Sequence, residues 1–509
     1  MAASLWRKTD WREIIIGTYD FSRNQKLQLS TVTLTISQIL TTNEMSSSFE
    51  SATPHNKSVA IIGAGLVGCL TALSLSKRSG YSVTLFELRP DPRLESTSKS
   101  SKNLRSINLA VSDRGLNALR RVDPGLESRI LEKVIPMTGR MIHKLSGEEE
   151  SQKYALDGKK GINSIDRGYL NELLLEELDI SEKKVEVKFG YKLEKVQEDG
   201  KISFTNTNTK QQEQFQFDLV IGADGSFSKV RSELQKFIRL DYSQQYIDCA
   251  YLELSIPALD NNGFSLDKNH LHIWPRDDFM LIALPNLDGS FTSTFFAPWG
   301  LFESKELSND EGILKFFRYN FPDAVELIGE ESLLYAFAHH PRGKLLSLKC
   351  NQYNYKDKIL IIGDAAHSMV PFYGQGMNCG FEDVFVLTEL LDKHRDDLSL
   401  AFEEYSQTRV HDLSAIVDLA ISNYKEMSHK VNSKLFLLKT KIDFLLTKSL
   451  GDRWLPLYTM VSFRADIGYA KAVQISKRQD IILNWIQAGI VGLVGGLGLW
   501  NVLGRWARK

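Results

Sequence analysis

The stretch Val59–Gly68, with the sequence VAIIGAGLVG, decides the fold. Its first four residues are apolar, which is typical of a strand buried inside a parallel sheet, and its glycines follow in the spacing GxGxxG. The next apolar pattern predicts a helix over 69–77, and residues 81–86 predict a second strand that ends at Glu87. Strand, glycine turn, helix, strand and acid, in this order, predict a Rossmann-like dinucleotide-binding unit.

Each glycine has a mechanical reason in such a unit. Gly63 permits the tight turn, Gly65 lets the backbone approach a pyrophosphate, and Gly68 lets the helix pack closely on the strand. The N-terminus of the helix offers free N–H groups and a positive dipole end to the phosphates. Glu87 can accept hydrogen bonds from ribose hydroxyls. The alternative is a tight turn without a ligand, which the complete order of elements disfavours.

Composition excludes several classes of protein. The chain has 509 residues, enough for roughly three domains, and its 43% hydrophobic and 25% charged residues are ordinary globular values. Lys plus Arg number 62 and Asp plus Glu number 63, so no basic surplus indicates a nucleic-acid partner. The four cysteines form no CxxC pair, and we therefore expect neither a disulfide framework nor a metal site.

The two ends of the chain differ from the rest. Residues 1–57 are rich in Ser and Thr, and we expect a poorly ordered N-terminal extension. Residues 481–504 carry no charge and are flanked by basic residues on both sides. This pattern predicts one C-terminal transmembrane helix, with a buried core helix as the alternative. The short basic tip behind it is typical of an anchor in the mitochondrial outer membrane, with the folded body facing the cytosol.

Two later segments each predict a strand that is followed by a glycine and an aspartate. Residues 218–225 form an apolar strand that ends in Asp224-Gly225, and residues 359–367 form another that ends in Gly363-Asp364. A glycine-rich loop over 374–380 follows, and then a predicted helix. The alternative is two ordinary strand ends of a large α/β sheet.

Together these three stretches resemble the signature sequences of the class A flavin-dependent aromatic hydroxylases, in the order of that family. The resemblance implies bound FAD, with Asp364 on the ribityl chain and the loop at Gly376 against the isoalloxazine ring. It also implies NADPH as a co-substrate that docks without a Rossmann domain of its own. The implied FAD-binding residues are Gly63, Gly65, Val67, Gly68, Phe86, Glu87, Leu88, Arg89, Ala110, Arg167, Leu193, Asp364, Gly376, Met377 and Asn378.

Several longer runs resemble the branch of this family that acts on L-kynurenine. They cover residues 105–115, 135–143, 241–246, 271–276 and 456–463. This resemblance implies that NADPH and O₂ are used to hydroxylate L-kynurenine to 3-hydroxy-L-kynurenine through a flavin C4a-hydroperoxide, a step of tryptophan catabolism towards NAD synthesis. The alternatives are another membrane-bound class A hydroxylase, or a membrane-bound FAD-binding scaffold without activity.

The same resemblance implies the residues of a substrate pocket. Arg140 is the family position for the carboxylate of the substrate, which a guanidinium can hold by two charge-assisted hydrogen bonds. Tyr373 departs from the Phe or His expected at its position but keeps an aromatic ring. The implied substrate-binding residues are Arg140, Tyr154, Asn423, Tyr458, Phe296, Phe372 and Tyr373. The alternating residues Met280, Ile282 and Leu284 fit either the pocket or the core of a sheet.

No covalent nucleophile, catalytic base or metal ligand is assigned, because the chemistry belongs to the flavin. We expect an α/β fold with a Rossmann-like FAD-binding domain, a β-sheet substrate domain, a C-terminal helical region and one C-terminal transmembrane helix. The expected boundaries are 58–235 and 345–395 for FAD binding, 236–344 for the substrate sheet, 396–480 for the helical region that closes the active site, and 481–504 for the membrane anchor.

Overall fold

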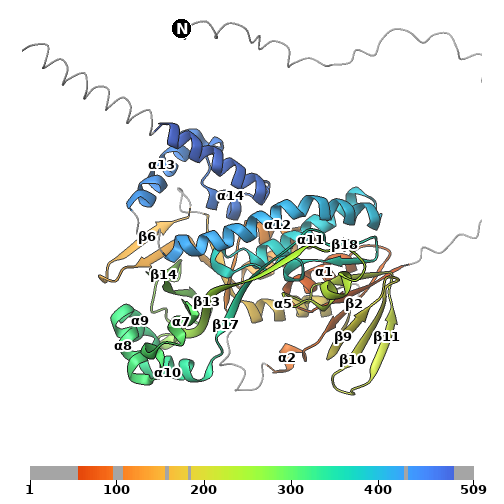
Figure 1. Cartoon of the computed structure of the whole chain (residues 1–509), viewed down its shortest axis with the longest axis horizontal. Coiled ribbons are helices and arrows are strands. Elements are labelled where there is room, and N and C mark those ends of the chain that lie inside the picture. Colours follow the sequence, from red (N-terminus) through yellow and green to blue (C-terminus); the bar gives the residue numbers. More distant parts are fainter. Residues whose placement is uncertain (1–55, 96–106, 155–159, 182–184, 429–433, 487–509) are drawn as a thin grey trace, which may run out of the picture. The chain divides into compact units, whose positions relative to one another are not determined.

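The computed structural model describes residues 56–95, 107–154, 160–181, 185–428 and 434–486 (Figure 1). The expected N-terminal extension covers residues 1–57, of which residues 1–55 lie outside these described ranges.

A six-stranded sheet is built around β1 (Lys57–Ile62), as the first motif predicts. Strand β1 pairs in parallel with β2 (Tyr81–Glu87) on one side and with β12 (Leu219–Gly222) on the other. The order of the sheet is β18 (Asn354–Tyr355), β19 (Ile359–Ile361), β12, β1, β2 and β8 (Glu186–Phe189). Only β18 runs antiparallel to its neighbour. The carboxyl ends of β1, β12 and β19 therefore meet at one edge, where ligands of such sheets bind.

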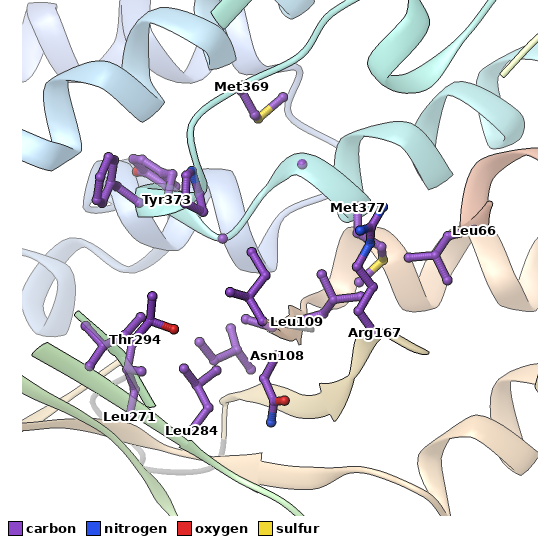
Figure 2. A pocket seen from close by; sticks show the side chains of 18 of the residues that line it. Leu66, Asn108, Leu109, Arg167, Leu271, Leu284, Thr294, Met369, Tyr373 and Met377 are labelled. Atoms are coloured by element: carbon purple, nitrogen blue, oxygen red, sulfur yellow. The ribbon is translucent and has the colours of Figure 1, made fainter. Parts of the chain in front are cut away.

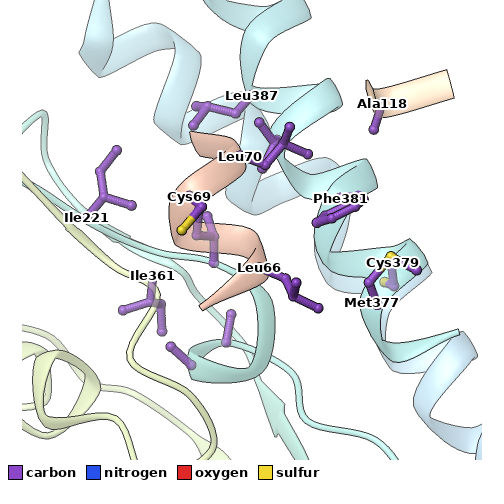
Figure 3. Packing of buried hydrophobic residues seen from close by; sticks show 14 of the residues in the cluster. Leu66, Cys69, Leu70, Ala118, Ile221, Ile361, Met377, Cys379, Phe381 and Leu387 are labelled. Atoms are coloured by element: carbon purple, nitrogen blue, oxygen red, sulfur yellow. The ribbon is translucent and has the colours of Figure 1, made fainter. Parts of the chain in front are cut away.

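Helix α1 (Leu66–Ser76) connects β1 to β2 and is buried along almost its whole length. It packs against α5 (Arg167–Ile180) and α11 (Gly376–Lys393). In Figure 3, Cys69 and Leu70 of α1 lie between Ile221 of the sheet and Leu387 of α11. Each fully buried leucine of this kind contributes about 2 kcal/mol to stability. This packing fixes the N-termini of α1 and α11 relative to each other.

Two small antiparallel sheets flank this unit. The first is a meander of β9 (Tyr191–Val196), β10 (Lys201–Asn206) and β11 (Gln212–Gln216). The second has the order β3 (Asn108–Val111), β7 (Ile162–Asp166) and β4 (Ile135–Met137). Both belong to the stretch that was expected to bind FAD.

A seven-stranded sheet forms the second large layer. Its order is β17 (Gly343–Cys350), β13 (Tyr242–Ile256), β16 (Phe291–Ala297), β15 (Phe279–Pro285), β14 (His270–Arg276), β5 (Gly139–His143) and β6 (Glu149–Lys153). All neighbours are antiparallel except β5 and β14. Strands β5 and β6 join this sheet although they lie far upstream of the expected substrate domain.

Three helices cover one face of the seven-stranded sheet and leave the other face to the FAD-binding part. They are α8 (Asp310–Asn320), α9 (Pro322–Ile328) and α10 (Glu330–His339). Leu252 and Phe295 point into the core beneath these helices. Because side chains alternate along a strand, their neighbours Phe296 and Thr294 point to the opposite face.

The C-terminal part is helical. Helix α12 (Leu398–Ser428) is long and lies along α11 (Figure 1). It is followed by α13 (Lys434–Leu450), α14 (Leu457–Phe463) and a last helix over 469–486. The remaining short helices are α2 (Pro92–Glu95), α3 (Asp113–Val122), α4 (Pro124–Leu131), α6 (Lys229–Leu234), η2 (Asp260–Asn262), α7 (Trp299–Phe302), η3 (Lys305–Leu307), η4 (Gly363–Ala365), η5 (Pro371–Tyr373) and η7 (Gly451–Arg453).

The predicted transmembrane helix is wrong. Among the residues that the structure describes, no helix is both long and apolar enough to cross a bilayer. The last described helix, 469–486, carries charged residues at Lys471, Lys477, Arg478 and Asp480. The remainder of the predicted span, 487–504, lies outside the described residues. The location at the mitochondrial outer membrane stays a prediction.

Candidate active site

The glycine turn after β1 leaves no room for a side chain at two positions. Gly63 has a φ of +104°, and a Cβ there would lie 2.5 Å from the carbonyl oxygen of Ala223. A Cβ on Gly68 would lie 1.9 Å from the carbonyl oxygen of Gly63. The turn therefore packs on β12 and α1 through backbone atoms.

Gly65 is different, because it borders open space. It is the N-cap residue of α1, and a Cβ at this position would have no heavy atom within 4 Å. The first N–H groups of an α-helix have no acceptor within the helix. Open space, free donors and the positive end of the helix dipole together fit a pyrophosphate group.

Glu87, at the end of β2, holds the turn from the side. Its Oε2 accepts a hydrogen bond from the backbone N–H of Ala64 at 2.8 Å, and its Oε1 accepts one from the N–H of Arg89 at 3.0 Å. Each carboxylate oxygen has a second lone pair. Glu87 can therefore brace the turn and still accept a hydrogen bond from a ligand hydroxyl.

Phe86, Leu88, Arg89 and Leu193 are four of the eight expected cofactor residues that do not line the cavity described below. Phe86 is buried in the core and stacks on Phe204, with 4.3 Å between the ring centroids. Leu193 is buried on β9, while Leu88 and Arg89 are exposed just beyond the end of β2. Phe86 and Leu193 both belong to the buried core that includes the six-stranded sheet and the meander β9–β11.

A cavity of about 330 Å³ lies between the edge of the six-stranded sheet and the free face of the seven-stranded sheet. Figure 2 shows Leu66, Arg167 and Met377 at one end and Leu271, Leu284 and Thr294 at the other. The expected site residues that line it are Gly65, Val67, Ala110, Arg140, Arg167, Phe296, Asp364, Phe372, Tyr373, Gly376, Met377 and Tyr458. Those that do not line it are Gly63, Gly68, Phe86, Glu87, Leu88, Arg89, Tyr154, Leu193, Asn378 and Asn423.

Asp364 faces the cavity from η4, at the carboxyl end of β19. Its side chain is exposed to the cavity but enclosed by protein. Burial raises the pKa of its carboxyl group, and the charges of Arg167 and His367 act in the opposite direction. Because Asp364 lines the cavity, its carboxyl oxygens can accept hydrogen bonds from a hydroxylated chain there.

Helix α11 points its N-terminus at the same cavity. The chain enters it through η5 and through Gly374, whose φ is +67°, and the helix begins at Gly376. Asn378 does not reach the cavity, because its amide is used as a brace. Its Nδ2 donates to the carbonyl oxygens of Ala110 and Gly374, and its Oδ1 accepts from the N–H of Ser112, each at 2.8 Å.

These features fit FAD. The open space at Gly65 suits the pyrophosphate, and the carboxylate of Asp364 suits the polyol chain between pyrophosphate and ring. The N-terminus of α11 at Gly376 would stabilise negative charge on a reduced flavin ring through its dipole.

Arg140 lies at the other end of the cavity, on β5, beside a stack of tyrosines. Its guanidinium carbon is 4.9 Å from the ring centroid of Tyr458 and 5.6 Å from that of Tyr154. The ring of Tyr458 stacks on Tyr154 at 5.2 Å and on Tyr373 at 5.7 Å. Tyr154 is buried behind Tyr458, so Arg140, Tyr458 and Tyr373 form the surface that a ligand would meet.

Phenylalanines wall the same end. The rings of Phe296 and Phe372 are 5.1 Å apart, and that of Phe372 is 4.5 Å from Tyr424. Asn423 is buried outside the cavity, where its Nδ2 donates to the carbonyl oxygen of Phe372 at 2.6 Å. Asn423 therefore positions the loop that carries Phe372.

Met280, Ile282 and Leu284 line the cavity, and Met280 and Leu284 also belong to buried core clusters, so both interpretations of this strand hold. Sequence analysis missed Leu271 and Thr294, which line it from neighbouring strands. Thr294 lies two residues before Phe296, so strand alternation could have found it. Leu271 opens the run 271–276 that carries part of the resemblance, but no pattern in that run marks it as a pocket residue.

A buried ion-pair network lies behind η4. His367 Nε2 is 2.5 Å from Asp383 Oδ2, and Arg409 Nη2 donates to Asp383 Oδ1 at 2.6 Å. Burial opposes the charge on His367, but the Asp383 carboxylate outweighs it and raises the imidazole pKa to about 10. His367, Cys379 and Asp383 lie close enough to share a metal ion. Both carboxylate oxygens are already engaged by cationic partners, however, so a further cation would be repelled.

The comparisons with known proteins agree with this geometry. The family model described as "FAD binding domain" matches residues 56–418. The solved structure of pqsL, a probable FAD-dependent monooxygenase from Pseudomonas aeruginosa, superimposes with a TM-score of 0.59 over 75% of this chain and 99% of that chain, at 19% identity. A 2-methyl-3-hydroxypyridine-5-carboxylic acid oxygenase gives a TM-score of 0.57 over 74% of this chain and 93% of that chain, at 18% identity. Both structures show that the fold is shared.

Sequence similarity is much higher to two yeast enzymes. The kynurenine 3-monooxygenase of Candida albicans is 54% identical over 457 residues, which cover 89% of this chain and 98% of that enzyme. The kynurenine 3-monooxygenase of Saccharomyces cerevisiae is 47% identical over 463 residues, which cover 88% and 99%. On the fold, the cavity and these similarities, the chain belongs to the kynurenine 3-monooxygenase family of FAD-binding proteins.

Proposed function

We propose that the chain hydroxylates L-kynurenine to 3-hydroxy-L-kynurenine, with FAD as its cofactor and with NADPH and O₂ as co-substrates. The observation that carries this proposal is the cavity. It joins two helix N-termini and a carboxylate at one end to an arginine and an aromatic wall at the other. The first end suits a cofactor with an anionic centre. The second end suits an aromatic amino acid.

A bound FAD would supply the redox chemistry, in which NADPH provides two electrons and O₂ provides both oxygen atoms, one for the substrate ring and one for water. Gly65 and Val67 would hold its pyrophosphate end, Asp364 its polyol chain, and Gly376 and Met377 its ring. The contribution of the protein is placement, water exclusion and a fixed electric field.

Arg140 anchors the carboxylate of the substrate. A guanidinium and a carboxylate form charge-assisted hydrogen bonds that are roughly twice as strong as neutral ones. The neighbouring ring of Tyr458 attracts the same guanidinium by its π face and so limits its orientations. The amino-acid tail is thereby held at the Arg140 end, and the aromatic ring extends towards the flavin end.

The apolar wall orients the aromatic ring and excludes water. Phe296 and Phe372 contact each other at this wall, and Met280 and Ile282 line it from β15. An amine on the ring donates electron density to the adjacent carbon. The proposal therefore requires no protein base at the reacting atom.

The direct test is consumption of NADPH by the purified, FAD-loaded protein before and after L-kynurenine is added. We expect a strong stimulation by L-kynurenine. Kynuramine, which lacks the carboxylate, should require at least a tenfold higher concentration, because it cannot use Arg140. Equal responses to both compounds would contradict the role of Arg140. Bound FAD without any stimulation would instead identify a scaffold, and stimulation by another aromatic compound alone would identify a different hydroxylase.

A further inference from the structure

Arg114, on α3, is a buried arginine that does not line the cavity. It is 1% exposed. Its Nε donates to the carbonyl oxygen of Val461 at 2.6 Å, and its Nη1 donates to Glu382 Oε1 at 2.5 Å. The remaining nitrogen, Nη2, donates to three further carbonyl oxygens, those of Met460 at 3.3 Å, Arg464 at 3.2 Å and Ile467.

The accepting carbonyls belong to a single segment, 460–467, which contains the end of α14 and the turn after it. The last carbonyls of a helix have no donor within the helix, and they form the negative end of its dipole. A guanidinium at this position donates hydrogen bonds to these carbonyls and places a positive charge at the negative end of the dipole. The ring of Tyr469, just beyond the segment, lies 4.1 Å from the guanidinium carbon. Arg114 thus ties this segment to α3 almost entirely through its backbone.

Glu382, on α11, supplies the opposing charge. Its other oxygen, Oε2, accepts from Arg409 Nη1 at 2.9 Å. Burying an isolated guanidinium is unfavourable, and breaking a buried pair leaves that cost uncompensated. Arg114 is therefore held between α11 and the 460–467 segment and cannot turn away to solvent. The helix that starts at the cavity and the segment that follows the cavity-lining Tyr458 are thus both bound by the Arg114 side chain.

The segment matters for the cavity because α14 carries Tyr458 near its start. Tyr458 lines the cavity and lies beside Arg140. Its position depends on how α14 is held. Lysine at position 114 would keep the charge for Glu382, but a single ammonium group lacks the planar fork needed to reach the carbonyls of both Val461 and Ile467.

We propose that Arg114 is a positioning residue for the hydroxylation: it fixes the segment 457–467 against α3 and α11 and so holds Tyr458 at the cavity beside Arg140. This inference rests on the proposed function, because the consequence of moving Tyr458 is weaker binding of the substrate. Arg114 itself contacts neither the cavity nor the reacting atoms.

The test compares Arg114→Lys with the wild-type FAD-loaded protein. We expect backbone amides of residues 458–467 to exchange hydrogen at least tenfold faster, while amides of residues 57–76 keep their rates. We expect the KM for L-kynurenine to rise about tenfold, with kcat within about twofold and bound FAD unchanged. The matched control is Arg120→Lys on the same helix: the Arg120 side chain is exposed and pairs with Glu127 away from residues 457–467, so both readouts should keep their wild-type values.

Native exchange over 458–467 together with a native KM in Arg114→Lys would overturn the proposal. Equal acceleration over 57–76 and 458–467 would also overturn it, because it would make Arg114 a general core residue. If Arg114→Lys does not fold, Glu382→Gln decides, since its amide oxygen still accepts a hydrogen bond but carries no charge. Glu382→Gln should accelerate hydrogen exchange over 458–467 but not over 57–76, by a smaller factor than Arg114→Lys. Equal acceleration over both stretches would contradict the proposal. If the wild-type protein does not turn over L-kynurenine, the proposed function fails, and the exchange pattern still decides the role of Arg114.

Discussion

At the scale of single residues, the candidate site depends most on Arg140. Its guanidinium is fixed on a strand, beside two tyrosine rings at 4.9 and 5.6 Å. Such pre-organisation lowers the entropy cost of binding a carboxylate. The neighbouring Tyr154 hydroxyl has a raised pKa, because burial disfavours its ionised form. It therefore stays a neutral hydroxyl and adds no negative charge near the carboxylate.

Replacing Arg140 by methionine should raise the KM for L-kynurenine about 10- to 100-fold, because a charge-assisted hydrogen bond contributes about 1.5–3 kcal/mol. Bound FAD should stay at the wild-type level, since Arg140 lies at the far end of the cavity. Steady-state kinetics and the flavin absorbance of the purified variant measure both quantities. Arg318→Met, which removes an exposed pair with Glu330, is the control. An unchanged KM in Arg140→Met would show that Arg140 does not bind the carboxylate of the substrate.

Some of these residues could be found from the sequence and others could not. Arg140 and Tyr458 were implied by runs of sequence around them, and both line the cavity. Asn423 was implied in the same way, but its side chain turns to the carbonyl oxygen of Phe372. The direction of a buried amide depends on which carbonyl lies beside it, and a tertiary contact of this kind leaves no local pattern.

At the scale of elements, the turn from β1 into α1 needs glycine for two different reasons. Gly68 is small because the backbone of Gly63 lies against it, whereas Gly65 faces open space beside a helix N-terminus. The first use is structural and the second suits a ligand. Strand, turn and helix were predictable here because their signals are local and regular.

Alanine at these two positions should therefore have different effects. Gly68→Ala places a Cβ 1.9 Å from a carbonyl oxygen and should prevent folding, or lower the melting temperature by roughly 10 °C or more. Gly65→Ala should fold with a native circular dichroism spectrum and a native apoprotein melting temperature, but bind FAD at least tenfold more weakly, since its methyl group enters the pyrophosphate space. Equal FAD affinity in Gly65→Ala and wild type would show that the phosphate does not bind there.

The elements that the sequence did not place are those whose neighbours are distant in the chain. Strands β5 and β6 pair into the seven-stranded sheet through β14, more than a hundred residues downstream. Their alternation is ordinary, and nothing local reveals the partner. The predicted membrane helix is also wrong: its first residues, 481–486, end a described helix, 469–486, that carries Lys471, Lys477, Arg478 and Asp480 before them.

At the scale of the whole molecule, a buried network joins the segments that surround the cavity. Arg114, Glu382, Arg409, Asp383 and His367 alternate in charge from α3 through α11 and α12 to the loop of Asp364. The N–H of Gly363, next to Asp364, also donates to Asp383. The two ends of the cavity thus depend on one network.

This network predicts how stability changes with pH. In the folded protein the imidazole pKa of His367 is about 10, against 6.5 for an ordinary histidine. The folded state therefore keeps a proton that the unfolded state loses, and this contribution is complete below about pH 6.5 and declines as the pH rises towards 10. Between about pH 6.5 and 8.5 the loss should be on the order of 2 kcal/mol.

Urea unfolding of the wild type and of His367→Gln at several pH values measures this contribution. Glutamine keeps a hydrogen-bonding group beside Asp383 but does not titrate, so the difference between the two proteins should shrink as the pH rises. A difference that stays constant across this range would show that His367 is not protonated in the folded state.

The central claim is that one cavity brings FAD and L-kynurenine together so that oxygen from O₂ enters the ring. The most direct measurement supplies the purified protein with NADPH, L-kynurenine and isotopically heavy O₂, and analyses the product by mass spectrometry. The account predicts 3-hydroxy-L-kynurenine with one heavy oxygen atom, in an amount that matches the NADPH consumed. NADPH consumption without hydroxylated product, or a product whose new oxygen is light, would contradict it.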